Sequence, residues 1–132
     1  ALRASVLRHP PGHIQRTAAY FLSLGHYDAL IRKMSRMLSD RRRVMDDAIK
    51  TCGLAVAGRA YFGGSSFWMQ APDGVDTRDL ANKLVPKGVL IEPGHSFFAQ
   101  PNPPQQFYRL AYSSIGAERI GEGVAKIASE LT

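Results

Sequence analysis

Residues 88–114 read GVLIEPGHSFFAQPNPPQQFYRLAYSS, and the rest of the chain is best interpreted outward from this stretch. Its first part, residues 89–91, is a short apolar run that predicts a buried strand ending at Pro93-Gly94. After a loop and a proline-rich crossing, residues 107–113 predict a second strand that carries a single charged side chain, Arg109. A charge in mid-strand costs free energy unless it is paired or exposed, so Arg109 must hold a partner or face water.

Arg109 has three interpretations from the residues alone. A guanidinium is a rigid fork of donors that matches a carboxylate at two points, and a strand would hold that fork in a fixed position. Alternatively, Arg109 forms a salt bridge to an acidic neighbour such as Glu92, or lies in water at a sheet edge. In the loop between the two strands, His95 is the only histidine placed where a ligand would arrive, although an ordinary loop residue is the plainer interpretation.

The composition indicates a folded domain. The chain has 132 residues, of which 45% are hydrophobic and 21% charged, which suits one domain with its own core. No apolar run approaches the roughly 20 residues of a membrane span, and no signal peptide is visible. The single cysteine, Cys52, has no obvious base beside it and is interpreted as a structural thiol in a reducing, cytoplasmic setting. The start at Ala1, without Met, suggests a piece of a larger protein.

Hydrophobic periodicity predicts an α/β fold of the α+β two-layer type: a small, mainly antiparallel sheet of three or four strands with helices on one face. Trp68 is expected to face the core or a domain interface, and Asp76 to cap a helix. Helices are predicted at residues 13–24, 27–51, 76–85 and 116–131, and strands at residues 54–59, 65–71, 89–91 and 107–113.

The helix predicted at residues 27–51 is longer than a small domain needs, so we expect it to extend past its own core to another domain. Its methionines, Met34, Met37 and Met45, are predicted to pack in the core. The net charge of +6 is concentrated in this helix, where a solvated face is the plainer interpretation. A basic nucleic-acid-binding α/β domain remains an alternative, although no zinc-finger, RNA-binding or helix-turn-helix motif is recognisable. The basic residues are Arg32, Lys33, Arg36, Arg41, Arg42 and Arg43.

Several motifs in order resemble the C-terminal small domain of fold-type I, pyridoxal-phosphate-dependent aminotransferases of class I/II. The string GVLIEPGHSFF resembles the family's G-V-x-x-x-P-G-x-x-F segment, and Tyr108-Arg109-Leu110 with Ser113 resembles its x-R-L-x-x-S strand. With the string GVLIEPGHSFF, the sequence most resembles the aminotransferase-like domain of MocR-type regulators of the GntR family. The other matching segments are Gly63-Gly64 with Trp68, residues 72–76, and residues 118–124.

The resemblance implies roles for particular residues. Arg109 would hold the α-carboxylate of an amino acid or 2-oxo acid, and Phe97 and Phe98 would lie near the mouth of the active site. Residues 1–26 would be a segment and short helix left over from the large-domain side, and residues 27–132 the aminotransferase-like small domain. One departure leaves the substrate open: Ser65-Ser66 stands where many members have a bulkier apolar pair.

The resemblance also implies what this chain lacks. The cofactor-linking lysine and the aspartate that binds the cofactor's ring nitrogen would lie in the large domain, so the 132 residues alone are expected to be catalytically inert. We expect no catalytic residue, no metal ligand and no bound cofactor in this fragment. Pyridoxal 5'-phosphate would bind in a full-length parent, DNA would be bound only through an absent N-terminal domain, and the parent would be a homodimer without membrane contact. A fragment of a genuine 2-aminoadipate or aromatic aminotransferase is the alternative.

Overall fold

The computed structural model describes residues 11–58 and 64–132, so Gly63 of the glycine pair lies outside the described residues. The chain divides into two compact units, residues 1–37 and residues 38–132. The boundary falls inside the long helix α3, which spans His26–Thr51 and confirms the helix predicted at residues 27–51. The assignment of residues 1–26 to a large-domain remnant stays a prediction.

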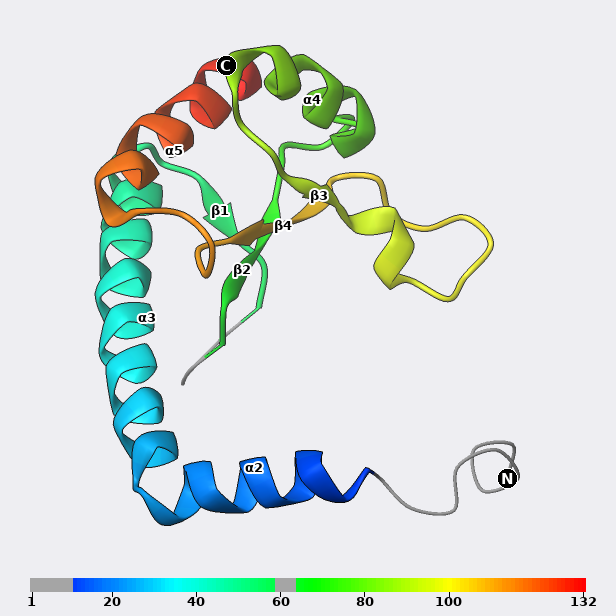
Figure 1. Cartoon of the computed structure of the whole chain (residues 1–132). Helices are drawn as coiled ribbons and strands as arrows, with labels where there is room; N and C mark the ends of the chain where they lie inside the picture. Colours follow the sequence, from blue (N-terminus) through cyan, green and yellow to red (C-terminus); the bar gives the residue numbers. More distant parts are fainter. Residues whose placement is uncertain (1–10, 59–63) are drawn as a thin grey trace. The chain divides into compact units, whose positions relative to one another are not determined.

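The second unit contains a four-stranded antiparallel sheet with the strand order β1-β2-β4-β3 (Figure 1). The central pair is formed by β2 (Ser66–Gln70) and β4 (Phe107–Ala111), flanked by the two-residue strands β1 (Ala55–Val56) and β3 (Glu92–Pro93). Short edge strands leave few unpaired backbone groups exposed, and the proline in β3 offers no N–H at all. This is the predicted small antiparallel sheet.

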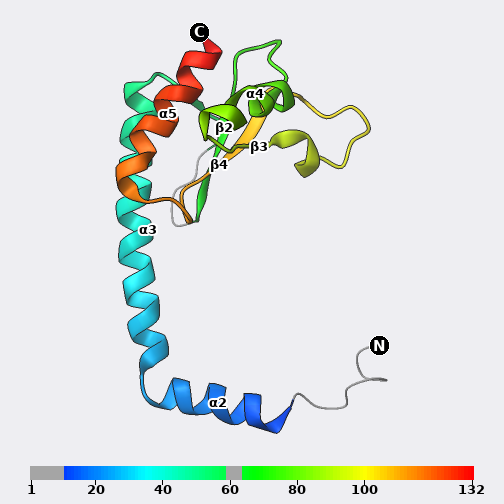
Figure 2. The same cartoon turned by 45° about the horizontal axis from the view of Figure 1, so that its top comes forward.

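Buried and less buried side chains alternate along β2 and β4, so the sheet has one face toward the core and one open face. Phe67 and Met69 of β2 and Tyr108 and Leu110 of β4 are buried, whereas the residues between them are only half-buried. The buried face packs against the C-terminal half of α3, α4 (Thr77–Leu84) and α5 (Ala117–Leu131), and α4 and α5 lie next to each other (Figures 1 and 2). The α+β two-layer prediction is thereby confirmed. The helical side chains of this core are Met45, Ile49, Leu80, Leu84, Ile120, Val124 and Ile127.

Helix α4 is fixed to the sheet at its first turn. Asp76 is the N-cap, as predicted, and its carboxylate accepts a hydrogen bond from the backbone N–H of Arg78. The next residue, Thr77, is buried, and its hydroxyl lies 2.8 Å from the carbonyl oxygen of Gln105 and 2.9 Å from that of Phe107. The start of α4 is therefore joined to the residues that enter β4.

The strand predicted at residues 89–91 is wrong in position. The 3-10 helix η1 (Val85–Lys87) ends at Gly88, whose φ of 75° suits glycine, and the N–H of Val89 bonds back to the carbonyl of Leu84. The chain therefore leaves the helix too late to pair at once with β4, and the pairing begins at Glu92. Only Ile91 of the apolar run is buried, while Leu90 is 79% exposed.

The first unit is helical where it is described. Helix α2 (Gly12–Ser23) ends before Gly25, whose φ of 72° confirms the predicted stop, and α3 begins at His26. No residue of α2 is buried, and Met34 and Met37 of α3 are exposed as well, so the predicted core role holds for Met45 alone of the three methionines. Large apolar side chains of this unit that face water are Ile14, Tyr20, Phe21, Leu22, Leu24, Tyr27, Leu30, Ile31, Met34 and Met37.

Candidate functional site

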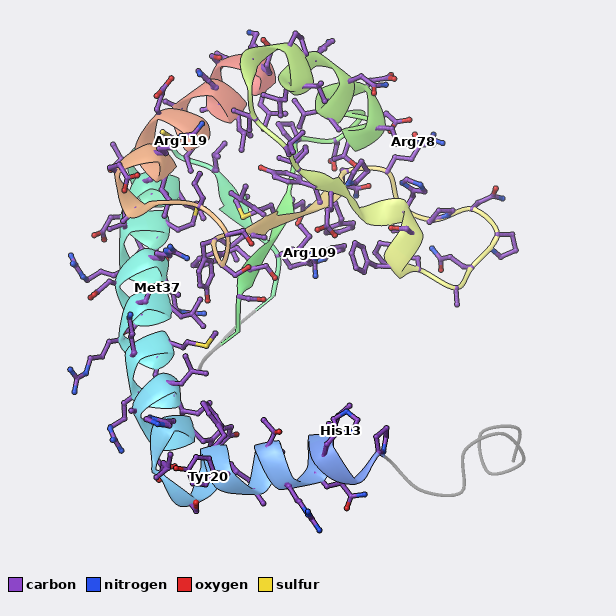
Figure 3. All side chains as sticks on the ribbon, in the orientation of Figure 1. His13, Tyr20, Met37, Arg78, Arg109 and Arg119 are labelled. Atoms are coloured by element: carbon purple, nitrogen blue, oxygen red, sulfur yellow. The ribbon has the colours of Figure 1, made fainter. Side chains whose placement is uncertain are left out.

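Three side chains form a row across the open face of the sheet. In the strand register, Arg109 of β4 lies directly opposite Trp68 of β2 on one side and directly opposite Glu92 of β3 on the other. Directly paired residues project to the same face of a sheet, so the three side chains are neighbours. Figure 3 shows Arg109 on the side of the sheet away from α5 and from the C-terminal half of α3. Trp68, predicted to face the core or an interface, lies half-buried on this open face.

The guanidinium of Arg109 has a carboxylate on one side and an aromatic ring on the other. Its Nη2 donates to Oε1 of Glu92 at 2.5 Å, which is the salt bridge that the sequence left open. The carbon at its centre lies 5.5 Å from the centroid of the Phe97 ring, within the range of a cation–π contact. The Nε atom is buried and has no acceptor among the described residues. Because the side chain as a whole is 39% exposed, solvent still reaches part of the fork.

Four aromatic rings, which we call the aromatic cluster, gather beside Arg109: Trp68, Phe97, Phe98 and Phe107. Trp68 is at the centre, stacked on Phe107 at 6.0 Å with an interplanar angle of 7° and edge-on to Phe97 at 5.4 Å. Phe98 closes the group, with its centroid 6.1 Å from that of Trp68 and 5.9 Å from that of Phe107. Such offset and edge-to-face contacts hold rings in fixed positions. The cluster is a rigid apolar wall next to a cation.

The short 3-10 helix η2 (Gly94–Phe97) brings Phe97 to this wall because Gly94 has no side chain. A Cβ atom at Gly94 would lie 2.5 Å from the carbonyl oxygen of Phe107, a separation that real Cβ atoms do not show. The glycine therefore permits the close approach of η2 to β4. The sequence marked Pro93-Gly94 as the end of a strand and as part of a family segment. It missed both this contact and the site role of Phe107, whose place beside Trp68 depends on the strand register.

No family model matches the chain, but individual proteins do. It is 61% identical over 131 residues to the HTH-type transcriptional regulator TauR of Rhodobacter capsulatus, covering 99% of this chain and 27% of the regulator. It is 31% identical over 108 residues to aromatic-amino-acid aminotransferase 1 of Thermococcus litoralis, covering 81% of this chain and 26% of the enzyme. The chain thus spans about a quarter of the length of these two curated relatives.

Solved structures show the same fold. LysN, an alpha-aminoadipate aminotransferase of Thermus thermophilus, matches 98% of this chain with a TM-score of 0.80 and 24% identity, over 33% of its own length. A multiple substrate aminotransferase of Thermococcus profundus matches 84% with a TM-score of 0.73 and 27% identity, over 28% of its own length. The chain is an aminotransferase-like domain. The regulator match over nearly its whole length confirms the predicted similarity to aminotransferase-like domains of MocR-type regulators.

Two other candidate residues of the aminotransferase-like domain, His95 and Cys52, are not members of the row of Trp68, Arg109 and Glu92. His95 belongs to η2, and its Nδ1 is buried without a hydrogen-bond partner in the described part of the chain. Cys52 is a half-buried thiol just after α3 and packs against the core, in line with the structural role predicted for it. Within residues 11–58 and 64–132 no group of three or more His, Cys, Asp or Glu side chains is arranged to hold a metal ion. The described helices also include none that is both long and apolar enough to cross a bilayer.

Two arginines of the basic run in α3 make contacts inside the domain. Nη1 of Arg41 donates to the carbonyl oxygen of Ser113 at 2.5 Å, which ties the helix to the segment after β4. The guanidinium of Arg42 lies 5.1 Å from the centre of the Phe67 ring. The prediction of a solvated face therefore holds for Arg32, Lys33, Arg36 and Arg43, which are exposed. It does not hold for Arg41 and Arg42, which are half-buried.

Proposed function

We propose that this domain is the effector-binding part of a transcriptional regulator of the GntR/MocR type and that Arg109 holds the carboxylate of an amino acid or 2-oxo acid. The observation that supports it most directly is the state of the Arg109 guanidinium: one donor is paired with Glu92, Nε has no acceptor among the described residues, and the group is partly exposed. Phe97 and Phe98 of the aromatic cluster would contact the rest of the ligand.

We further propose that the ligand meets pyridoxal phosphate in the full-length protein, where the cofactor would supply an electron-withdrawing ring for amino-acid chemistry. The LysN structure was determined with N-(5'-phosphopyridoxyl)-L-leucine. We propose that the residues of this chain do not form such a cofactor site by themselves. Its five lysines lie on α3, α4, η1 and α5, and none lies on the strands or on η2 around Arg109. This chain would therefore supply the carboxylate clamp, and other residues of the parent the cofactor site.

The exposed apolar side chains of the first unit support the proposal that the parent contains more protein than this chain. Contiguous apolar side chains on a water-facing surface usually mark a contact with another domain or subunit. Helix α2, the residues after it and the first turns of α3 carry exposed apolar side chains, including Phe21, Leu24 and Tyr27. We propose that the parent is a homodimer in the cytoplasm and that it binds DNA through an N-terminal domain.

A working aminotransferase is the second candidate, and the match to the Thermococcus litoralis enzyme favours it. The two functions make different predictions for the purified full-length protein. A regulator binds an operator fragment in an effector-dependent manner and turns over little or no amino acid. An aminotransferase converts a 2-oxo acid to an amino acid at steady state and does not bind DNA. DNA binding by residues 11–132 themselves, weakening steeply with salt, would support the nucleic-acid-binding alternative instead.

Substitution of Arg109 tests the carboxylate clamp. In the full-length protein with pyridoxal phosphate, Arg109→Ala should weaken amino-acid binding by about tenfold to a hundredfold in calorimetry, because charge-assisted hydrogen bonds are lost. Arg109→Lys keeps the charge and loses the fork of donors, so its amino-acid affinity should lie between those of the wild type and of Arg109→Ala. Cofactor binding should stay nearly intact. Arg78→Ala is the matched control, since Arg78 is an exposed arginine on α4 that is paired with Asp76. Unchanged amino-acid affinity in Arg109→Ala would mean that Arg109 serves only to pair with Glu92.

A further inference from the structure

The proposed carboxylate site already contains a carboxylate, and this limits which ligands it accepts. We infer that Glu92 makes the site selective for ligands with one carboxylate and an uncharged, apolar side chain, and that it disfavours dicarboxylates. The inference rests on the proposed function of Arg109 and adds the chemical class of ligand. It follows from three features of the open face: the placement of Glu92, the local charge, and the aromatic cluster.

Glu92 is placed to meet an incoming ligand. It lies directly opposite Arg109 in the pairing of β3 with β4, and its Oε1 accepts from Nη2 of Arg109. The Glu92 side chain is 51% exposed, more than that of Arg109, so a ligand in solution can reach its carboxylate. A ligand that reaches the remaining donors of Arg109 must come close to the Glu92 carboxylate.

The charge at the site is already balanced before a ligand arrives. The +1 of Arg109 is matched by the −1 of Glu92. A ligand's first carboxylate gains fork hydrogen bonds from Arg109, which offset its repulsion by Glu92. A second carboxylate on the ligand side chain would find the charge of Arg109 already shared between Glu92 and the first carboxylate. It therefore adds repulsion without a compensating partner.

The aromatic cluster favours an apolar side chain on the ligand. Trp68, Phe98 and Phe107 are half-buried against one another, whereas Phe97 is 51% exposed and offers a ring face beside the clamp. Apolar ligand atoms that cover this ring leave water and gain free energy in proportion to the area buried. An ionised side chain would lose its hydration there instead.

Isosteric ligands test the inference in the full-length protein with pyridoxal phosphate. L-Glutamate and L-glutamine differ in one charge and hardly in shape, and L-phenylalanine adds the apolar contact. By calorimetry, the wild-type protein should bind L-glutamine about tenfold more tightly than L-glutamate, and L-phenylalanine more tightly than L-glutamine. Glu92→Gln should remove most of the difference between glutamine and glutamate, chiefly through tighter glutamate binding. Glu92→Asp keeps the charge and should keep the discrimination.

The outcomes separate this inference from the proposed function. If Arg109→Ala leaves the affinity for all three ligands unchanged, the clamp itself is refuted. If Arg109→Ala abolishes binding but Glu92→Gln raises the affinity for glutamate and glutamine by the same factor, Glu92 is a plain competitor for Arg109 and the inferred selectivity is wrong. Tighter binding of glutamate than glutamine by the wild-type protein would also overturn it. Circular dichroism and gel filtration of each variant establish that the protein remains folded.

Discussion

Gly94 lies so close to Phe107 that a methyl group at residue 94 would stand 2.5 Å from the carbonyl oxygen of residue 107 and 2.9 Å from its Cβ. The contact sits where η2 meets β4, next to the ring of Phe97 and the guanidinium of Arg109. The absence of a side chain at Gly94 thus allows η2, which carries Phe97, to lie close to β4, which carries Arg109.

Gly94→Ala should therefore lower both stability and ligand affinity. The added methyl group pushes η2 away from β4, and overpacking of this kind costs about 1–3 kcal/mol of unfolding free energy. Urea unfolding followed by circular dichroism measures the loss. Gly121→Ala in α5 is the matched control: a Cβ there meets nothing within 4 Å, and alanine favours a helix over glycine by about 0.5–1 kcal/mol. Equal stability of Gly94→Ala and wild type would contradict the close packing.

Thr77→Val should destabilise the domain by about 1–2 kcal/mol, because it removes the hydroxyl that lies within hydrogen-bond distance of two carbonyls at the entry to β4. Valine has almost the same shape as threonine, so packing in the buried position is preserved. Thr77→Ser keeps the hydroxyl and should retain the bonds while losing a methyl group. Thermal unfolding of the three proteins compares the contributions of the hydroxyl and the methyl group. A valine variant as stable as wild type would mean that the hydroxyl contributes nothing net.

The sequence predicted the layers of this fold better than the details of its site. The apolar spacing of Ile120, Val124 and Ile127, the cap at Asp76 and the alternation along β4 are local signals, and the structure contains all of them. The prediction of a strand at residues 89–91 failed because an apolar run indicates that residues are buried. It does not indicate at which residue the pairing with a neighbouring strand begins. The end of η1 extends to its cap at Gly88, and β3 therefore starts three residues later than expected.

The candidate site required the register between strands, which no local pattern contains. Arg109 stood out as a charge in mid-strand, Phe97 and Phe98 were expected near the site from the family resemblance, and Glu92 was a possible partner. That Trp68 and Glu92 flank Arg109 on one face, and that Phe107 stacks on Trp68, follows only from the pairing of β2 and β3 with β4. In the first unit, helical spacing predicted the helices correctly. It did not predict that Met34 and Met37 of α3 are exposed.

Asp76→Ala should cost about 1 kcal/mol through loss of the N-cap of α4 and should also change the pH dependence of stability. The side-chain hydrogen bonds from Arg78, followed by the Arg78 backbone N–H, lower the pKa of Asp76 below its ordinary value of 3.8. Because the folded pKa is the lower one, this contribution to stability is present above about pH 4 and is lost as the pH falls through the folded pKa.

Asp76→Ser separates the two effects of Asp76. Serine still caps the helix but has no charge for Arg78 and does not titrate, so it should keep most of the stability at pH 7 and lose less of it on acidification. Urea unfolding at pH 7 and at pH 3 compares the wild type with both variants. An equal loss of stability on acidification in wild type and Asp76→Ser would show that Asp76 has no part in the acid sensitivity.

Tyr108 and Tyr112 form a matched pair for measuring how much a buried hydroxyl contributes to the free energy of unfolding. Both side chains are almost completely buried, but the hydroxyl of Tyr112 donates to the carbonyl of Gly64 at 2.8 Å, whereas that of Tyr108 has no partner among the described residues. Tyr112→Phe should therefore lose about 1 kcal/mol and leave a carbonyl unpaired, while Tyr108→Phe should be neutral or slightly stabilising. Urea unfolding at neutral pH orders the three proteins; Tyr108→Phe as the less stable variant would mean that its hydroxyl has a partner.

The same substitution makes a prediction at alkaline pH. Burial raises the pKa of Tyr108 to about 12 from an ordinary value of 10.0. Between these two values the unfolded chain has released the phenol proton and the folded chain has kept it, so stability falls as the pH rises through this window. Tyr108→Phe removes the titrating group, and its stability should fall less steeply between pH 10 and pH 12 than that of the wild type or of Tyr112→Phe. Parallel curves for all three proteins would show that the phenol of Tyr108 ionises as readily in the folded state as in the unfolded one.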